Sequence, residues 1–158
     1  MTGDDLQLRR AEKTDADQIF ALAREFALSF RPERAPFDAA LPQLMENEDA
    51  FLMVATVDGV VRGYLLGFTH LTLFANGRVA WVEEAMIEGG FRRHGLGRLL
   101  LEEFEAWART RDAGYVALAT RRAAEFYRAL GYDVSATYYR KMLTRPPVTP
   151  PSVTPPAG

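Results

Sequence analysis

FRRHGLGRLLLEEF, residues 91–104, is the stretch from which both the fold and the function can be approached. Its first eight residues contain three arginines, one histidine and two glycines, and its second half is leucine-rich with helical periodicity. Glycine lets backbone N–H groups approach a ligand closely, and the N-terminus of a helix adds positive potential. The stretch therefore predicts an anion-binding turn that leads into an amphipathic helix.

The composition limits the kinds of protein that can carry such a turn. The chain has 158 residues, of which 48% are hydrophobic and 25% are charged, with a formal net charge of −2. These values fit one globular domain, expected over residues 1–145, and they give no indication of a nucleic-acid partner. The absence of cysteine excludes disulfides, thiolate metal sites and a cysteine nucleophile.

The N-terminus and the proline-rich tail lead to two further expectations. The N-terminus differs from a signal peptide, and no apolar run approaches ~18 residues, so we expect a cytoplasmic protein without a membrane partner. Six of the last thirteen residues, 146–158, are proline. Because such a composition cannot build a core, we expect this tail to be disordered.

The hydrophobic pattern predicts an α/β fold with a mixed (α+β) sheet and helices on both of its faces. The turn signals Asp58-Gly59 and Asn76-Gly77 join three strands into an antiparallel β-meander. An α-β-α-β series follows the meander, and the prolines before it leave a loop with at most a short helix near residues 37–46. The expected strands are 6–9, 51–57, 60–74, 78–87, 115–120 and 135–143, and the other expected helices are 14–30, 96–113 and 121–132.

Three kinds of phosphate-binding loop compete for the glycine-rich turn. A Walker A loop requires Gly-Lys-Ser/Thr, whereas Arg98 and Leu99 follow Gly97. A dinucleotide-binding G-x-G-x-x-G requires glycine at position 100, where the chain has leucine. The pattern that remains is Arg92-x-x-Gly95-x-Gly97, in which charge-assisted contacts from arginine supplement the backbone N–H groups.

Two motifs, in order, resemble the GNAT superfamily of acetyl-CoA-dependent N-acetyltransferases. The pyrophosphate loop of that family, Arg/Gln-x-x-Gly-x-Gly/Ala, is matched by residues 92–97, and VEEAMI at 82–87 matches the strand that usually precedes it. The second signature, Ala-x-x-(Phe/Leu)-Tyr-x-x-x-Gly-(Phe/Tyr), is matched by residues 123–132. The expected elements agree with the family over residues 5–143. One departure is Thr120, which stands where similar proteins usually carry asparagine, after a loop that is shorter here.

The resemblance implies acetyl-CoA as the co-substrate and no metal. It also implies that the strand backbone lines the thioester and the pantetheine arm, while the glycine turn binds the pyrophosphate. The residues implied in cofactor binding are Ala85, Met86, Ile87, Arg92, Arg93, His94, Gly95, Leu96, Gly97, Arg98 and Thr120.

Acetyl transfer requires a neutral amine, but alkylammonium groups lose their proton only near pH ~10. A carboxylate that accepts this proton helps, and a tyrosine hydroxyl can protonate the leaving thiolate. The resemblance supplies Tyr127 as the general acid, and Glu83 or Glu84 as the acidic group that faces the amine. Outside the motif, Tyr127 would be interpreted as a core aromatic, and either glutamate as a solvated side chain.

The two adjacent glutamates need to be ranked. Strand alternation puts them on opposite faces, with Glu84 on the face of Val82, and a bulge near Ala85 would reverse the phase locally. The resemblance ranks Glu83 first, because in similar small-amine acetyltransferases the acidic residue nine positions before the loop commonly meets the acceptor. Glu84 is then expected to form a second acidic wall.

We therefore interpret the chain as an N-acetyltransferase that moves the acetyl group of acetyl-CoA to a primary amine by direct attack in a ternary complex. The expected acceptor is a small molecule such as a polyamine, an amino acid or an aminoglycoside. The alternatives are acetylation of a protein N-terminus or lysine, and a non-catalytic acyl-CoA-binding module. The loop 30–42 is expected to select the acceptor, and the candidate pocket residues are Phe30, Arg31, Arg34 and His70. The oligomeric state stays open, and a homodimer is compatible with the sequence.

Overall fold

The computed structural model describes residues 4–27 and 29–144, so the proline-rich segment 146–158 lies outside the described residues. The strands are β1 (Leu6–Arg10), β2 (Ala50–Val57), β3 (Val60–Leu71), β4 (Arg78–Ile87) and β5 (Val116–Leu118). The helices are α1 (Ala16–Glu25), α2 (Arg34–Glu46), α3 (Leu96–Thr110) and α4 (Ala124–Ala129), with the 3-10 turns η1 (Lys13–Asp15) and η2 (Gly89–His94). The strands form one sheet in sequence order, antiparallel except for the parallel pair β4–β5.

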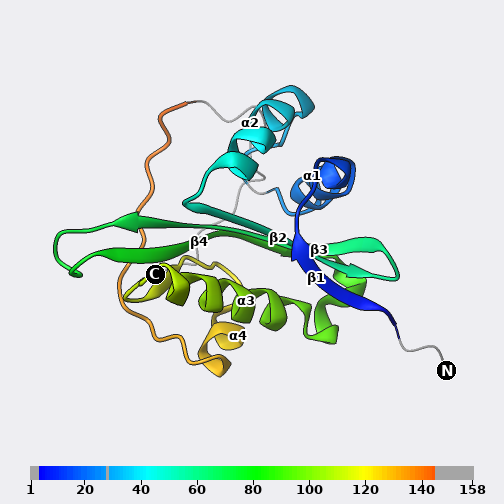
Figure 1. The fold of residues 1–158 in the computed structure, drawn as a ribbon. Coiled ribbons are helices and arrows are strands. Elements are labelled where there is room, and N and C mark those ends of the chain that lie inside the picture. The colour runs from blue at the N-terminus through cyan, green and yellow to red at the C-terminus, as the bar shows by residue number, and fades with distance from the viewer. Residues whose placement is uncertain (1–3, 28, 145–158) are drawn as a thin grey trace, which may run out of the picture.

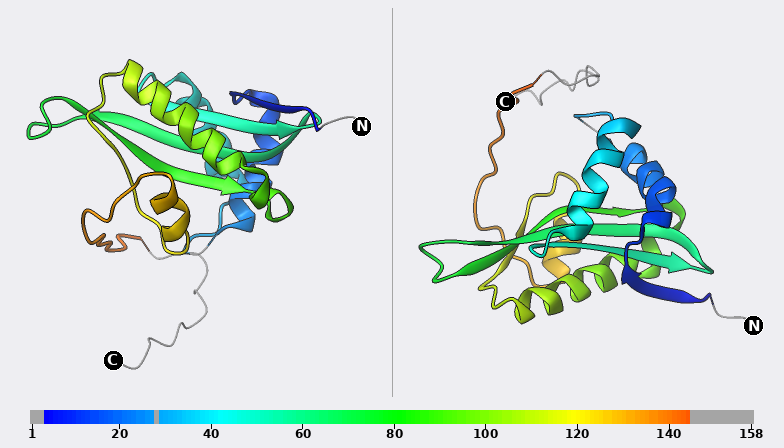
Figure 2. Two further views of the ribbon diagram at one scale, coloured as in Figure 1. Left: turned by 90° about the horizontal axis from the view of Figure 1, so that it is seen from below. Right: turned by 45° about the horizontal axis from the view of Figure 1, so that its top comes forward.

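Helices cover both faces of this sheet, as the sequence predicts. In Figures 1 and 2, α1 and α2 lie together on one face, and α3 runs across the other with α4 beside it. Each face has its own buried cluster, one that includes Leu100 and Phe104 of α3 and one that includes Ile19 of α1 and Leu41 of α2. The mixed α/β fold class is thereby confirmed.

The tight turns form where the sequence predicts them. Asp58 and Gly59 take left-handed backbone angles (φ 51° and 81°), as does Asn76 (φ 60°), and these angles close the β2–β3 and β3–β4 hairpins. At the end of α3 the prediction was less accurate. Asp112 takes the left-handed conformation (φ 58°) there, so the helix ends before reaching Gly114.

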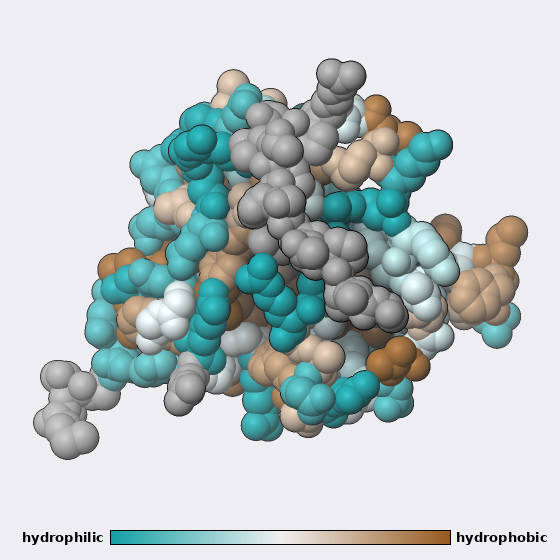
Figure 3. Space-filling view, turned by 180° about the vertical axis from the view of Figure 1, so that it is seen from behind, coloured by the Kyte–Doolittle hydropathy of each residue, from teal (hydrophilic) through white to brown (hydrophobic). Residues whose placement is uncertain are grey.

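The tip of the β3–β4 hairpin is a loop and not a continuation of the strand, so the predicted strand 60–74 was too long. Thr72 closes this loop, because its N–H and its hydroxyl each donate to the carbonyl oxygen of Gly77 at 2.7 Å. Leu73 and Phe74 are left exposed. The hairpin projects from the body of the molecule, and its apolar surface appears in brown at the right edge of Figure 3.

Helix α2 is longer than the sequence predicts. It spans Arg34–Glu46 and contains both Pro36 and Pro42. Pro36 lies in the first turn, where backbone N–H groups have no acceptor within the helix, so its missing N–H costs little there. Leu41 of α2 is buried in the cluster between this helix and the sheet. This packing stabilises α2, although its prolines disfavour a helix locally.

The predicted last strand, 135–143, does not form, and that prediction was wrong. The segment has no strand assignment, and Tyr139 and Leu143 are 87% and 91% exposed. Its contacts include a stacked pair between Tyr138 and Trp81, with ring centroids 6.4 Å apart, and a hydrogen bond from Arg140 to the Ser29 hydroxyl. An alternating pattern becomes a strand only beside an edge with room to pair, and β5 is three residues long.

Candidate active site

A β-bulge in β4 decides which way its acidic side chains point. Leu66 of β3 pairs with Glu84 whereas the next residue, Gly67, pairs with Val82, so Glu83 is the additional residue. Strict alternation would place Val82 and Glu84 on one face. The bulge separates them: Val82 joins the core under α3, while Glu84 lines a cavity on the face covered by α1 and α2.

The cavity on the α1–α2 face has a volume of about 560 Å³, within the range of small-molecule sites. Of the predicted pocket residues, Phe30 and Arg31 line it. Arg34 instead forms ion pairs with Asp17 and Asp38, at 2.6 and 2.8 Å, and His70 is exposed on β3. The lining residues are Ile19, Ala23, Phe30, Arg31, Pro32, Glu33, Pro36, Phe37, Ala40, Leu41, Leu44, Leu52, Tyr64, Leu66 and Glu84.

The two glutamates have different surroundings. The hydroxyl of Tyr64, itself only 2% exposed, donates to Oε1 of Glu84 at 2.8 Å. Burial raises the pKa of the Glu84 carboxyl, the hydrogen bond from Tyr64 opposes that rise, and the nearby charge of Glu83 adds to it. Glu83 is exposed, and its Oε2 accepts a hydrogen bond from the Trp81 indole at 3.0 Å. The geometry therefore favours Glu84 as the carboxylate inside the cavity.

A second cavity, of about 230 Å³, lies on the opposite face of β4. β5 pairs with β4 only as far as Val82, so within the described residues the backbone from Glu83 to Ile87 has no strand partner on that side. Ala85 and Ile87 line this second cavity. The other lining residues are Phe26, Leu65, Arg92, Gly95, Gly97, Leu101, Ala123, Phe126 and Tyr127. The two cavities thus flank β4 at consecutive residues, Glu84 and Ala85.

The glycine turn forms the rim of the second cavity. Gly95 takes a left-handed angle (φ 76°) and is the N-cap of α3. The first N–H groups of a helix have no acceptor within it, so those of the first turn of α3 are available to an anion. A Cβ at Gly97 would lie 3.3 Å from the Phe126 ring, so glycine keeps this approach open. The Arg92 guanidinium lies 4.9 Å from the centre of the Phe26 ring, beside the same cavity.

Comparison with known proteins gives the family of the chain. A family model described as Acetyltransferase (GNAT) family matches residues 16–132. The chain belongs to this family. It is accordingly an acyltransferase, and the GNAT family uses acetyl-CoA. No curated protein matches the chain.

Solved structures with a similar fold carry several names. One is a transcriptional regulator from Bacillus halodurans C-125 (TM-score 0.81, 21% identity, 87% of this chain and 99% of that chain). A second is glucosamine-6-phosphate N-acetyltransferase from Arabidopsis thaliana (TM-score 0.79, 16% identity, 88% of this chain and 99% of that chain). A third is an aminoglycoside N-acetyltransferase in complex with CoA (TM-score 0.76, 18% identity, 88% of this chain and 96% of that chain). At these identities the likeness shows the GNAT fold.

The remaining loop residues of the GNAT fold are engaged in different ways. Arg98 donates to Glu102 one turn later, at 2.8 Å, which partly neutralises its charge. The His94 ring packs against Phe91, with centroids 5.4 Å apart. Leu96 is buried in the core. Arg93 lies in η2. Of these residues, Leu96 anchors the start of α3, and the backbone N–H groups of the turn stay available to a ligand.

Tyr127 brings α4 to the second cavity. It is partly buried, its ring packs edge-on against Phe126 and Tyr132, and burial raises the pKa of its hydroxyl. Thr120 accepts a hydrogen bond from the Ala123 N–H at 3.0 Å, so its side chain supports the start of α4. The Met86 side chain packs into the core under α1 and α2, which leaves only its backbone for the second cavity.

Sequence reasoning missed two residues that shape the site. Tyr64 lies opposite Met86 on β3 and holds Glu84, and Phe26 at the end of α1 lines the second cavity under Arg92. Neither belongs to a motif, and a tyrosine in an apolar strand gives no signal that it will meet a carboxylate. In the part of the chain that the structure describes, no group of three metal-ligating side chains occurs, and no helix is long and apolar enough to cross a membrane.

Proposed function

We propose that this GNAT enzyme transfers the acetyl group of acetyl-CoA to a primary amine of a small molecule by direct attack in a ternary complex. One observation carries the proposal: two cavities flank β4, with Glu84 in one and Ala85 in the other. An acceptor on the α1–α2 face and a thioester on the α3 face would meet at this strand. That similar structures include amino-sugar and aminoglycoside N-acetyltransferases supports a small-molecule amine.

The residues of the α3 face fit a pyrophosphate and a pantetheine arm. Free backbone N–H groups at the start of α3 suit an anion, and the space in front of Gly97 is one that any side chain would fill. The Arg92 guanidinium supplies a full charge beside the second cavity, held against the Phe26 ring. In the part of the chain that the structure describes, the edge of β4 after Val82 is unpaired, and it offers N–H and C=O groups to an amide-containing chain.

In this proposal, Glu84 receives the proton of the ammonium group, directly or through water. A carboxyl whose pKa is raised by burial is a better proton acceptor than an ordinary surface carboxylate. The hydrogen bond from Tyr64 fixes one carboxylate oxygen and leaves the other for the amine. Glu83, exposed at the bulge, contributes negative charge at the entrance that attracts a cation.

Tyr127 protonates the leaving thiolate in this proposal. It lies on α4 beside Gly97 and Ala85 in the cavity assigned to CoA. A hydroxyl with a raised pKa keeps its proton at neutral pH until a basic thiolate appears. Glu84 takes one proton from the ammonium group and the neutral amine attacks. The thiolate leaves with the Tyr127 proton, Tyr127 regains a proton from the acylated nitrogen, and Glu84 releases its proton to solvent. The transfer is then complete without a covalent enzyme intermediate.

The test compares Glu84→Gln with Glu83→Gln, using release of free CoA from acetyl-CoA with a panel of primary amines. The glutamine variant at 84 keeps the size of the side chain but cannot take a proton. We expect its kcat/KM to fall by about 100-fold at neutral pH. It should recover partly as the pH approaches the pKa of the free amine. Glu83→Gln is the matched control and should stay within about fivefold of wild type. A loss confined to Glu83→Gln would return the role to Glu83, and binding of acetyl-CoA without turnover of any amine would favour a non-catalytic acyl-CoA-binding module.

A further inference from the structure

The cavity that holds Glu84 is apolar along most of its length. Of its fifteen lining residues, eleven have apolar side chains, and the polar ones are Arg31, Glu33, Tyr64 and Glu84. Arg31 and Glu33 are both exposed, in the segment between α1 and α2. The Tyr64 hydroxyl is already used by Glu84. Away from that exposed segment, therefore, the polar side chains among the described lining residues are Tyr64 and Glu84, and of these the Glu84 carboxylate is the group suited to an ammonium ion.

The floor of the cavity gives its length. Leu52 of β2 pairs with Leu66 of β3, which pairs with Glu84 of β4, so the three side chains form one row across the sheet. Neighbouring strands are 4.7–4.9 Å apart, so Leu52 lies about 10 Å from Glu84. Both leucines are buried, at 6% and 5% exposed. The row offers an apolar track that starts at the carboxylate.

The roof of the cavity is apolar as well. Ile19 and Ala23 of α1 and Phe37, Leu41 and Leu44 of α2 close over the row of side chains. A hydroxyl or a second ammonium placed along this row would lose its water. Apart from Tyr64 and Glu84, the polar side chains that line the cavity among the described residues are Arg31 and Glu33, which lie in the exposed segment between α1 and α2. This arrangement disfavours polyhydroxylated and polycationic acceptors. An apolar group would instead gain from burial.

We propose that the acceptor is a primary amine with one apolar body, an unbranched alkyl chain or an aryl-alkyl group, that extends up to about 10 Å from the nitrogen. The ammonium group lies at Glu84, and the apolar body lies along Leu66 and Leu52 beneath α1 and α2. This inference rests on the proposed function for the identity of the reacting group. It excludes the polyamines and aminoglycosides that the sequence alone leaves open as acceptors.

The first arm of the test is a homologous series of n-alkylamines from propylamine to octylamine, together with 2-phenylethylamine, assayed by CoA release. Each buried methylene is worth ~0.8 kcal/mol, which corresponds to a rise of about fourfold in kcat/KM. From propylamine to hexylamine we expect a rise of about sixtyfold, with a plateau once the track is filled. Hexamethylenediamine, of equal length but with a second ammonium, should fall at least about tenfold below hexylamine.

The second arm uses two adjacent exposed alanines of α2. Ala40 lines the cavity whereas Ala39 does not, so Ala40→Trp fills the apolar track and Ala39→Trp is its matched control. In Ala40→Trp the advantage of hexylamine over propylamine should shrink to about threefold or less. Ala39→Trp should keep the wild-type chain-length dependence. Equal melting temperatures of the two variants confirm that the difference arises in the cavity.

The outcomes separate this inference from the proposed function. Turnover that is highest with spermidine, kanamycin, glucosamine 6-phosphate or a lysine peptide, without chain-length dependence, overturns the apolar acceptor and leaves the acetyltransferase proposal standing. A chain-length dependence that survives in Ala40→Trp overturns the assigned cavity. If no amine is turned over, calorimetric binding of the alkylamines in the presence of CoA decides: affinity that rises with chain length supports the cavity assignment although the catalytic proposal fails, and absent binding overturns both.

Discussion

The two halves of β4 are built differently, and this difference places the site. The first half, Arg78–Val82, pairs with β3 along its whole length, and its residues Ala80–Val82 pair with β5 as well. The second half, Glu83–Ile87, begins at a bulge, and among the described residues it pairs with β3 alone. A strand paired on both sides has no backbone groups to offer, whereas the second half has a free edge and a side chain turned to each face.

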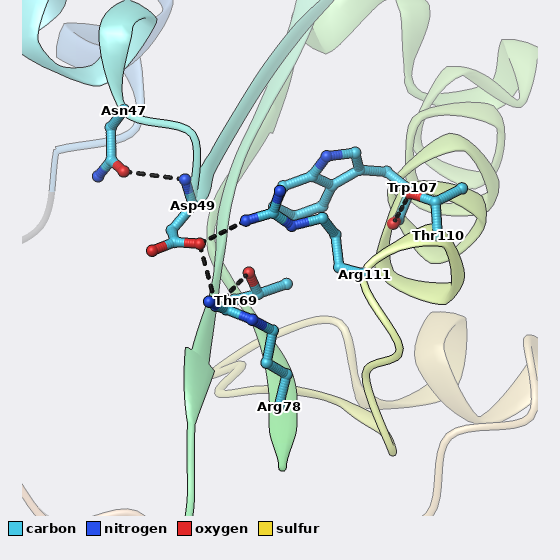
Figure 4. A network of polar contacts seen from close by, with 7 residues as sticks. All are labelled: Asn47, Asp49, Thr69, Arg78, Trp107, Thr110 and Arg111. Atoms are coloured by element: carbon cyan, nitrogen blue, oxygen red, sulfur yellow. Dashed lines mark hydrogen bonds and ion pairs between the residues drawn. The ribbon is translucent and has the colours of Figure 1, made fainter.

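The paired half is also held by charges. Asp49, at the start of β2, forms ion pairs with Arg78 at the start of β4 and with Arg111 after α3, as Figure 4 shows. Arg111 also lies over the Trp107 ring, with 5.8 Å between its guanidinium carbon and the ring centre. This network connects β2, β4 and α3, and Asp49, Arg78 and Arg111 are not among the residues that line either cavity. Stability and ligand binding are therefore expected to respond to different substitutions, and four predictions test that separation.

The largest expected effect is on acetyl-CoA binding at the open half. Gly97→Asp puts a Cβ 3.3 Å from the Phe126 ring and a negative charge beside the free N–H groups of α3. We expect calorimetric affinity for acetyl-CoA to fall by at least about 100-fold, while the melting temperature holds, because aspartate suits the first turn of a helix.

Gly90→Asp is the control for this prediction. It makes the same change of charge in η2, where a Cβ would meet open space, and affinity should stay within about threefold. Wild-type affinity in Gly97→Asp would mean that the pyrophosphate binds elsewhere.

The next effect is on turnover. Tyr127→Phe removes only the hydroxyl, so the ring contacts with Phe126 and Tyr132 persist. We expect kcat to fall by about 100-fold with acetyl-CoA affinity nearly unchanged, the scale of a positioned general acid. Tyr132→Phe, which loses a hydrogen bond to Glu105, should keep its kcat. Equal kcat in wild type and Tyr127→Phe would return Tyr127 to a packing role.

The sequence predicts the local features of this molecule well, and those that depend on distant neighbours less well. Asp58-Gly59, Asn76-Gly77 and the glycine turn could be predicted because each needs a backbone conformation that few residues adopt. The length of α2 and the fate of 135–143 could not, because they depend on whether an apolar face finds a core and whether an edge is there to pair.

The bulge at Glu83 shows the same limit within the site. Strand periodicity identifies two acidic positions on opposite faces, but the face each one takes depends on the register with β3. The register shifts at Gly67, where a Cβ would lie 2.4 Å from the Phe104 ring. Only glycine lets α3 pack this closely against the strand, and no pattern in VEEAMI carries that information.

A smaller effect is expected at the paired half. Asp49→Asn weakens two ion pairs between partly exposed groups, so we expect a loss of about 1–2 kcal/mol in the free energy of unfolding. Affinity for acetyl-CoA should be unchanged. Asp38→Asn, which removes an exposed pair with Arg34 within α2, is the control and should cost less stability than Asp49→Asn. A change in acetyl-CoA affinity in Asp49→Asn would show that the two halves of β4 are coupled.

The smallest effect is a pH dependence of stability that originates at Glu84. Burial raises the pKa of this carboxyl in the folded protein above its unfolded value. Between the two pKa values the folded state binds more protons than the unfolded state, so the contribution of Glu84 to stability is present at low pH and is lost as pH rises through the folded pKa. Glu84→Gln has no proton to lose. Its melting temperature should match that of wild type near pH ~4 and exceed it at neutral pH.

Tyr64→Phe removes the hydrogen bond that lowers the Glu84 pKa. In that variant, which keeps Glu84, the loss of stability with rising pH should therefore be steeper. A difference between Glu84→Gln and wild type that stays flat, or that shrinks as pH rises, would mean that the carboxylate is solvated in the folded protein and is no better a proton acceptor than Glu83.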